Sequence, residues 1–129
     1  MKPTTRDAVV ARLADHDPAV EVGVGNRPAV ATALAAAGVA VTATDVVPRE
    51  VPGDVRFVVD DVTDPEPGVY DDADVLYALN LPPELHRPFV AVARQHGAAA
   101  VFTTLGAEQP AVPVRRETIP GETLFWARE

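Results

Sequence analysis

Residues 20–45, VEVGVGNRPAVATALAAAGVAVTATD, constrain the fold more than any other part of the chain. A hydrophobic run meets two glycines, an alanine-rich segment with helical spacing follows, and a second hydrophobic run ends on Asp45. This order predicts two parallel strands joined by a helix that covers one face of their sheet. A Gly-x-Gly turn at the start of such a helix is typical of nucleotide-binding folds.

The same alternation of strand and helix continues to residue 104. Strands are expected at 19–24, 39–45, 55–61, 74–80 and 98–104, and helices at 5–15, 28–37 and 83–96. After residue 104, two alternating strands flank Pro120-Gly121, a pair that suits a type II turn. We therefore predict an α/β fold in a single domain of residues 1–129: a doubly wound, mainly parallel, Rossmann-like sheet with a C-terminal antiparallel hairpin.

The sixth strand needs a separate prediction because little chain precedes it. Only residues 105–111 separate it from the fifth strand, and a parallel crossover needs about a dozen residues. We therefore expect the sixth strand to run antiparallel beside the fifth.

Composition removes several classes of function. The 129 residues include no cysteine, which excludes disulfides, thiolate metal sites and cysteine nucleophiles, and no histidine pair has metal-ligand spacing. The net charge of −8 disfavours nucleic acid as a partner. No apolar run is long enough to span a membrane and the N-terminus lacks a signal-peptide core, so we expect a cytoplasmic protein. The acid-rich, lysine-poor composition suggests adaptation to high salt.

Four features each follow one of the first four expected strands. They are the glycine turn with Gly23 and Gly25, then Asp45, Asp61 and Asn80. Ligands of doubly wound sheets bind beyond the carboxyl ends of the parallel strands. The fold prediction therefore places all four features at the same edge of the sheet, where they would face one ligand.

The residues around the glycine turn indicate what kind of ligand that would be. Pro28 stands where a dinucleotide site has its third glycine, and proline removes one N–H from the helix start. The acid Glu21 would discourage a pyrophosphate but would suit an amine-bearing ligand. Asp45 follows Gly23 by 22 positions, where an acid accepts hydrogen bonds from ribose hydroxyls and disfavours a 2′-phosphate. NAD and NADP are thus less favoured than another adenosyl compound.

The acids after the third strand and the histidines leave alternatives open. Asp60 and Asp61 point to opposite faces, and we assign Asp61 to an adenine amino group, with Asp60 solvated or capping. Ordinary turn acids are the other interpretation. His86 lies close enough to Asn80 to act as a general base, but a solvated surface position is favoured for all three histidines, His16, His86 and His96.

Four segments together resemble a known family. Glu-x-Gly-x-Gly-Asn at 21–26, the acid ending the second strand, FVVDDVTD at 57–64 and YALNLPPEL at 77–85 resemble class I S-adenosylmethionine-dependent methyltransferases, in that order. More closely, the chain resembles a small archaeal, haloarchaeal-type family with a minimal methyltransferase-like Rossmann fold.

The resemblance implies S-adenosylmethionine as the cofactor and gives each candidate residue a role. Its methionine part would lie against Glu21, Gly23, Gly25 and Asn26. Asp45 would hold the ribose and Asp61 the adenine. Asn80 falls where methyltransferases place a catalytic or substrate-contacting polar residue.

Two departures from the family pattern bear on the acceptor. Leu81 follows Asn80 where amine-methylating enzymes have proline, and Glu84 stands where they have a stacking aromatic ring. The short loops also leave no substrate cap, so a second copy or another protein could complete the site. Three functions remain: a minimal methyltransferase of unknown acceptor, a non-catalytic adenosyl or nucleotide sensor, and, more weakly, an NAD binder.

Overall fold

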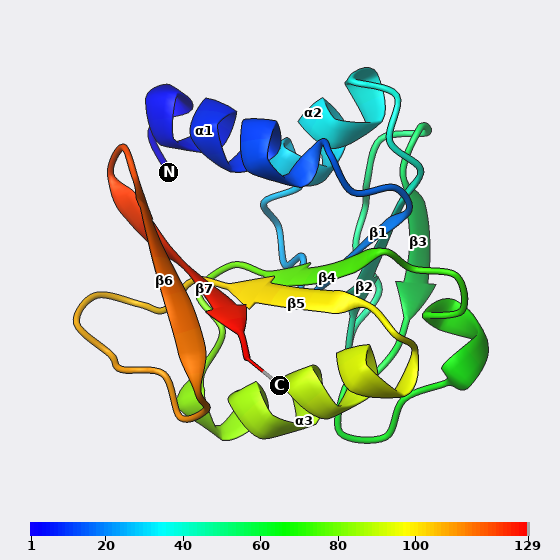
Figure 1. The fold of residues 1–129 in the computed structure, drawn as a ribbon. Helices are drawn as coiled ribbons and strands as arrows, with labels where there is room; N and C mark the ends of the chain where they lie inside the picture. Colours follow the sequence, from blue (N-terminus) through cyan, green and yellow to red (C-terminus); the bar gives the residue numbers. More distant parts are fainter. Residues whose placement is uncertain (129) are drawn as a thin grey trace.

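The chain alternates strands and helices up to β5 and then ends in a hairpin, as seen in a computed structural model that describes residues 1–128 (Figure 1). The helices are α1 (Pro3–Leu13), α2 (Ala29–Ala36), the short 3-10 helix η1 (Pro67–Val69) and α3 (Pro83–Gln95). The strands are β1 (Ala19–Val22), β2 (Val41–Asp45), β3 (Arg56–Val59), β4 (Val75–Ala78), β5 (Ala99–Phe102), β6 (Val114–Ile119) and β7 (Glu122–Ala127).

The seven strands form one sheet in the order β3-β2-β1-β4-β5-β7-β6. Strands β1 to β5 are parallel, whereas β7 is antiparallel to both of its neighbours, β5 and β6. It follows that β6 runs parallel to the first five strands. The predicted fold class, a mainly parallel doubly wound sheet with a C-terminal hairpin, is confirmed.

The prediction that the sixth strand lies antiparallel beside the fifth is wrong. The connection 103–113 contains no helix, yet it carries the chain past the position beside β5 to the edge of the sheet. The chain then turns back through the β6–β7 hairpin and places β7 between β5 and β6. An extended loop therefore makes the parallel crossover that usually requires a helix.

Helices cover the two faces of the sheet unequally. Helices α1 and α2 lie over one face and α3 over the other (Figure 1). Strand β1 is buried along its whole length because it is central and covered on both faces, with Ala19 in one core cluster and Val20 in the other. Among residues 1–128, no helix is long and apolar enough to cross a membrane.

The loops after β2 and β3 leave one edge of the sheet thinly covered. Residues 46–54 form no helix, as their prolines predicted, and residues 60–74 contain only the short η1. The edge strand β3 therefore has no buried residue, and its last residue, Val59, is 51% exposed. The carboxyl end of the sheet is consequently open on the β2–β3 side.

The β6–β7 hairpin closes through Pro120-Gly121, between the paired residues Ile119 and Glu122. Gly121 has φ +79°, as the third position of a type II turn requires. A Cβ at this position would lie 2.3 Å from Oγ1 of Thr5 in α1. The turn thus fixes the hairpin against the first helix.

We predict that Gly121→Ala lowers the free energy of unfolding by about 1–3 kcal/mol, because it adds both backbone strain and a clash with Thr5. Urea denaturation followed by circular dichroism measures the change. Gly53→Ala is the matched control, since Gly53 lacks a positive φ and has open space around it. Equal unfolding midpoints for the two variants would contradict the account of the turn.

Candidate functional site

Two glycines in left-handed backbone conformations hold open the turn after β1. Gly23 has φ +74° and Gly25 has φ +59°, values that other residues rarely adopt. Apart from the two chain neighbours, no atom of the described residues lies within 4 Å of the place that a Cβ would take at either glycine. The Thr44 carbonyl of β2 accepts hydrogen bonds from the N–H groups of Gly23 (3.0 Å) and Val24 (2.9 Å). The turn is therefore pinned to the sheet and accessible from solvent.

Asp45, the last residue of β2, joins its strand to the glycine turn. Its Oδ2 atom accepts a hydrogen bond of 2.8 Å from the Gly25 N–H and lies 3.5 Å from Nε of Arg49. Within residues 1–128, its Oδ1 atom accepts only the long 3.3 Å bond from the Val47 N–H. Because a carboxylate can accept about four hydrogen bonds, Oδ1 retains capacity for a ligand. The structure thus brings together the glycine turn and Asp45, two of the four features predicted for the site.

Asn80 lies two residues beyond β4, at the same edge of the sheet. Its φ of +55° is uncommon for a residue other than glycine, although asparagine tolerates it better than most. The Asn80 N–H donates to Oγ1 of Thr103 (2.8 Å), and the Leu81 N–H donates to the Thr103 carbonyl (2.9 Å). Asn80 itself is exposed. Thr103, the residue directly after β5, therefore holds the backbone of the exposed Asn80 in place.

Glu21 does not lie at the exposed edge. Its residue is 1% exposed, and its Oε1 atom accepts a 2.8 Å hydrogen bond from the Tyr77 hydroxyl, its register partner on β4. Burial raises the pKa of Glu21 to about 7, and the Tyr77 hydrogen bond opposes that rise. The expectation of an anionic side chain facing the ligand's amine therefore needs correction: Glu21 lies beneath the turn and supports it. Asn26, on the turn itself, is exposed.

The two acids after β3 have different surroundings. Asp60 is half-buried and accepts hydrogen bonds from the Tyr70 hydroxyl and, at 2.9 Å, from the Glu66 N–H. Asp61 is exposed, and its Oδ1 accepts hydrogen bonds from the Thr63 hydroxyl (2.7 Å) and N–H (2.8 Å), which lower its pKa. Asp60 is thus tied into the loop that it precedes, and Asp61 is the exposed acid of the pair.

His86 is buried, so its predicted surface position is wrong. Its Nδ1 atom accepts a 3.0 Å hydrogen bond from the Ala111 N–H, which leaves Nε2–H to donate to the Leu81 carbonyl at 2.9 Å. Both ring nitrogens are thereby used, and a role as general base is excluded in this geometry. The helical spacing of His86, Phe89 and Ala93 on the buried face of α3 was the sequence signal for this position.

The other two histidines lie at the opposite end of the sheet, where the parallel strands begin. Nδ1 of His16 lies 2.7 Å from Oδ2 of Asp74, and Nδ1 of His96 lies 3.3 Å from Oδ1 of Asp71. Both histidines are partly buried rather than fully solvated. They flank the amino ends of the strands and take no part in the candidate site.

Exposed apolar side chains also lie at the carboxyl end of the sheet. They were not predicted from the sequence. Val46 and Val47, 62% and 43% exposed, directly follow Asp45, and the exposed Val59 ends the neighbouring β3. Leu105, beyond β5, is 64% exposed. The signal was available in the sequence, since the Val-Val pair continues a hydrophobic strand into a segment with no room for a covering helix. We define the rim as the glycine turn, residues 45–47, Val59 to Asp61, and Asn80.

We predict that Glu21→Gln removes a pH dependence of stability. The unfolded chain loses the Glu21 proton near pH 4.5, whereas the folded chain keeps it to about pH 7, so the free energy of unfolding falls as pH rises between these values. The 2.5-unit difference corresponds to about 3 kcal/mol. Glutamine can still accept the Tyr77 hydrogen bond, so thermal denaturation should show stabilisation at pH 8 and little change at pH 4.5. Equal effects at both pH values would contradict the buried, raised-pKa position.

Two of the solved structures that this chain resembles in fold are described as methyltransferases. An RNA methyltransferase from Salinibacter ruber in complex with S-adenosyl-L-homocysteine matches with a TM-score of 0.65 and 17% identity, over 98% of this chain and 91% of that one. Magnesium protoporphyrin IX methyltransferase from Synechocystis, with bound S-adenosylmethionine, matches with a TM-score of 0.64 and 14% identity, over 95% and 76%. These likenesses show a methyltransferase-like Rossmann fold.

Relatives in archaea are much closer in sequence. A UPF0146 protein of Halobacterium salinarum is 55% identical over 127 residues, which are 98% of each chain. A UPF0146 protein of Archaeoglobus fulgidus is 48% identical over 86 residues, or 67% of this chain and 66% of that one. The family model described as "Uncharacterised protein family (UPF0146)" matches residues 4–129. The archaeal family expected from the sequence is confirmed: the chain belongs to the UPF0146 family.

Proposed function

We propose that the chain binds S-adenosylmethionine along the rim and acts as a minimal methyltransferase on an acceptor of unknown identity. The observation that carries this proposal is the hydrogen bond between the Asp45 carboxylate and the Gly25 N–H. It fixes an open glycine turn and a strand-end acid in one site, and these are the two elements that an adenosyl ligand with a ribose requires. The methyltransferase fold of the chain supports the same ligand.

The described residues fit the cofactor on three counts. The space above Gly23 and Gly25, which a Cβ would enter, gives room for close backbone approach. Oδ1 of Asp45 has capacity to accept hydrogen bonds from the ribose hydroxyls. The exposed Val46 offers an apolar surface for one face of the adenine, and the ionised Asp61 can accept a hydrogen bond from its amino group.

The chain's own residues would position the acceptor rather than deprotonate it. S-Adenosylmethionine supplies a methyl group on a sulfonium, whose transfer depends on in-line approach more than on a strong base. The exposed Asn80, held by Thr103 at the end of β4, would orient the acceptor through its side-chain amide. Glu21 and His86, both buried and hydrogen-bonded, would act only by supporting the turn and α3.

A non-catalytic sensor of adenosyl compounds is the second candidate. The short loops 46–54 and 60–74 and the exposed Val46 and Val59 leave the rim open to water. An open site suits binding and release better than a reaction that requires exclusion of solvent. A second copy or a protein partner that covers the rim would favour catalysis instead. NAD is a weaker third candidate because Pro28 caps α2 and offers no N–H there.

We predict that S-adenosylmethionine and S-adenosylhomocysteine raise the melting temperature of the protein in molar salt, and that NAD and ATP do so less. A ligand that binds only the folded state at 100 times its dissociation constant stabilises it by about 2.7 kcal/mol. Thermal-shift measurements with the four ligands test this order. No shift with either sulfur compound at millimolar concentration would overturn both leading candidates.

Asp45→Asn should weaken S-adenosylhomocysteine binding about ten- to a hundred-fold, the loss expected when hydrogen bonds to a charged group are removed. Asparagine can still accept the Gly25 N–H through its side-chain oxygen, so the turn should stay folded. Asp64→Asn, an exposed acid in the neighbouring loop, is the matched control and should leave affinity unchanged. Calorimetric titration measures both. An unchanged affinity for Asp45→Asn would show that the ribose assignment is wrong.

Transfer of a labelled methyl group to cell extract separates the enzyme from the sensor. A minimal methyltransferase should label an acceptor, and Asn80→Ala should lower the rate on the order of 10²-fold while leaving S-adenosylhomocysteine affinity unchanged. Tight binding with no labelled acceptor would favour the sensor. A full rate with Asn80→Ala would contradict the role given to that residue.

A further inference from the structure

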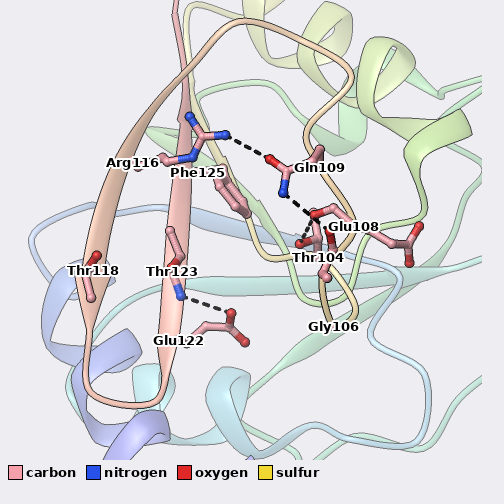
Figure 2. A pocket seen from close by; sticks show the side chains of 10 residues that line it. Thr104, Gly106, Glu108, Gln109, Arg116, Thr118, Glu122, Thr123 and Phe125 are labelled. Carbon is pink, nitrogen blue, oxygen red and sulfur yellow. Dashed lines mark hydrogen bonds between the residues drawn. The ribbon is translucent and has the colours of Figure 1, made fainter.

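A second candidate site lies beside the rim, between the β6–β7 hairpin and the loop after β5 (Figure 2). It is a cavity of about 260 Å³, below the size typical of drug-sized ligand sites. Four hairpin residues that share one face of the sheet, Arg116, Thr118, Thr123 and Phe125, form one wall, and Thr104 with residues 106–109 forms the other. The cavity exists because the crossover 103–113 is a loop, which leaves this face of the hairpin without a covering helix.

The two ends of this cavity carry opposite charges. Arg116 lies at one end, over the ring of Phe125 at 5.5 Å, and its Nη2 atom donates to Oε1 of Gln109 at 3.2 Å. Glu122 lies at the other end, beside the hairpin turn. Its strand position alternates with that of Thr123, but its side chain lines the cavity, where Oε1 accepts a 3.0 Å hydrogen bond from the Thr123 N–H and Oε2 keeps capacity for a ligand (Figure 2). Arg116 lies three residue steps along β6 from Ile119, the register partner of Glu122, which corresponds to about 10 Å along the strand.

Two threonines line the stretch of hairpin between these charges. Thr118 and Thr123 are register partners, and they lie on the same face as the Arg116–Phe125 pair. Both threonines line the cavity, between Arg116 and the hairpin turn. A hydroxyl can both donate and accept a hydrogen bond, so the pair matches a ligand whose middle carries an amide or a similar polar group.

The charges of the lining select against a simple anion or a simple cation. Arg116 attracts a carboxylate, but Glu122 at the opposite end repels one. An ammonium group is attracted by Glu122 and repelled by Arg116. Glu108 also lines the cavity, although its carboxylate points away from the hairpin (Figure 2). A ligand that satisfies both ends needs one group of each sign, held several bonds apart.

We propose that this cavity binds a small zwitterion whose carboxylate and ammonium groups flank a hydrogen-bonding centre, the chemistry of a dipeptide. Arg116 receives the carboxylate, Thr118 and Thr123 bond the amide, and Glu122 receives the ammonium group. The cavity is linked to the rim through the chain, because Thr103, which accepts the Asn80 N–H, directly precedes Thr104 of the lining. Binding of a ligand in the cavity should therefore also change the environment of the Asn80 amide.

Glycylglycine is the probe, and a titration of the ¹⁵N-labelled protein followed by NMR is the test. The expected result is saturable movement of the Gly106, Thr118 and Thr123 amide signals, with a smaller movement at Asn80. N-Acetylglycylglycine lacks the ammonium group and glycylglycinamide lacks the carboxylate, so each should bind at least tenfold more weakly. Equal binding of the three compounds, movement confined to other regions, or no movement would overturn the proposal.

Neighbouring arginines of β6 provide a matched pair of variants. Arg116→Gln should abolish the movement, whereas Arg115→Gln should preserve it, because Arg115 lies over Trp126 on the opposite face of the hairpin. Equal loss in both variants would show that general charge, not this cavity, binds the probe. S-Adenosylhomocysteine is titrated separately: its binding without that of glycylglycine would overturn only the zwitterion site, and the reverse result would overturn only the proposed function.

Discussion

The hydrogen bond from the Gly25 N–H to the Asp45 carboxylate is the interaction on which the rest of the site depends. It joins the turn after β1 to the end of β2, two segments that are 20 residues apart in the chain. A parallel sheet brings both to the same edge, and the open glycines let a ligand approach the backbone there. The other hydrogen bonds that join the turn to β2 are those from the Gly23 and Val24 N–H groups to the Thr44 carbonyl.

Buried polar pairs support the rim from below. Tyr77 holds Glu21 under the glycine turn, Tyr70 holds Asp60 at the end of β3, and the neutral ring of His86 ties the start of α3 to the crossover loop. Buried polar groups that are fully paired fix a single arrangement, whereas unpaired ones would be costly. Thus a chain with three main helices and short loops can still hold its exposed site residues in defined positions.

The sequence was sufficient for the fold and for the position of the candidate residues, because strand alternation alone places Asp45 and Asn80 at the same end of the sheet. It was insufficient for Glu21, whose partner Tyr77 lies 56 residues away and is set only by sheet register. It was also insufficient for the sixth strand, since loop length does not reveal that residues 103–113 cross the sheet without a helix. Contacts between distant segments, rather than local patterns, account for both failures.

The most direct test of the central claim is an NMR titration of the ¹⁵N-labelled protein with S-adenosylhomocysteine. If the rim is an adenosyl site, the largest movements should be those of the Gly23, Gly25, Val46 and Val47 amide signals. Signals from the amino-end edge around His16 and Asp74 should stay in place. Movements centred on that opposite edge, or no movement at saturating ligand, would contradict the account.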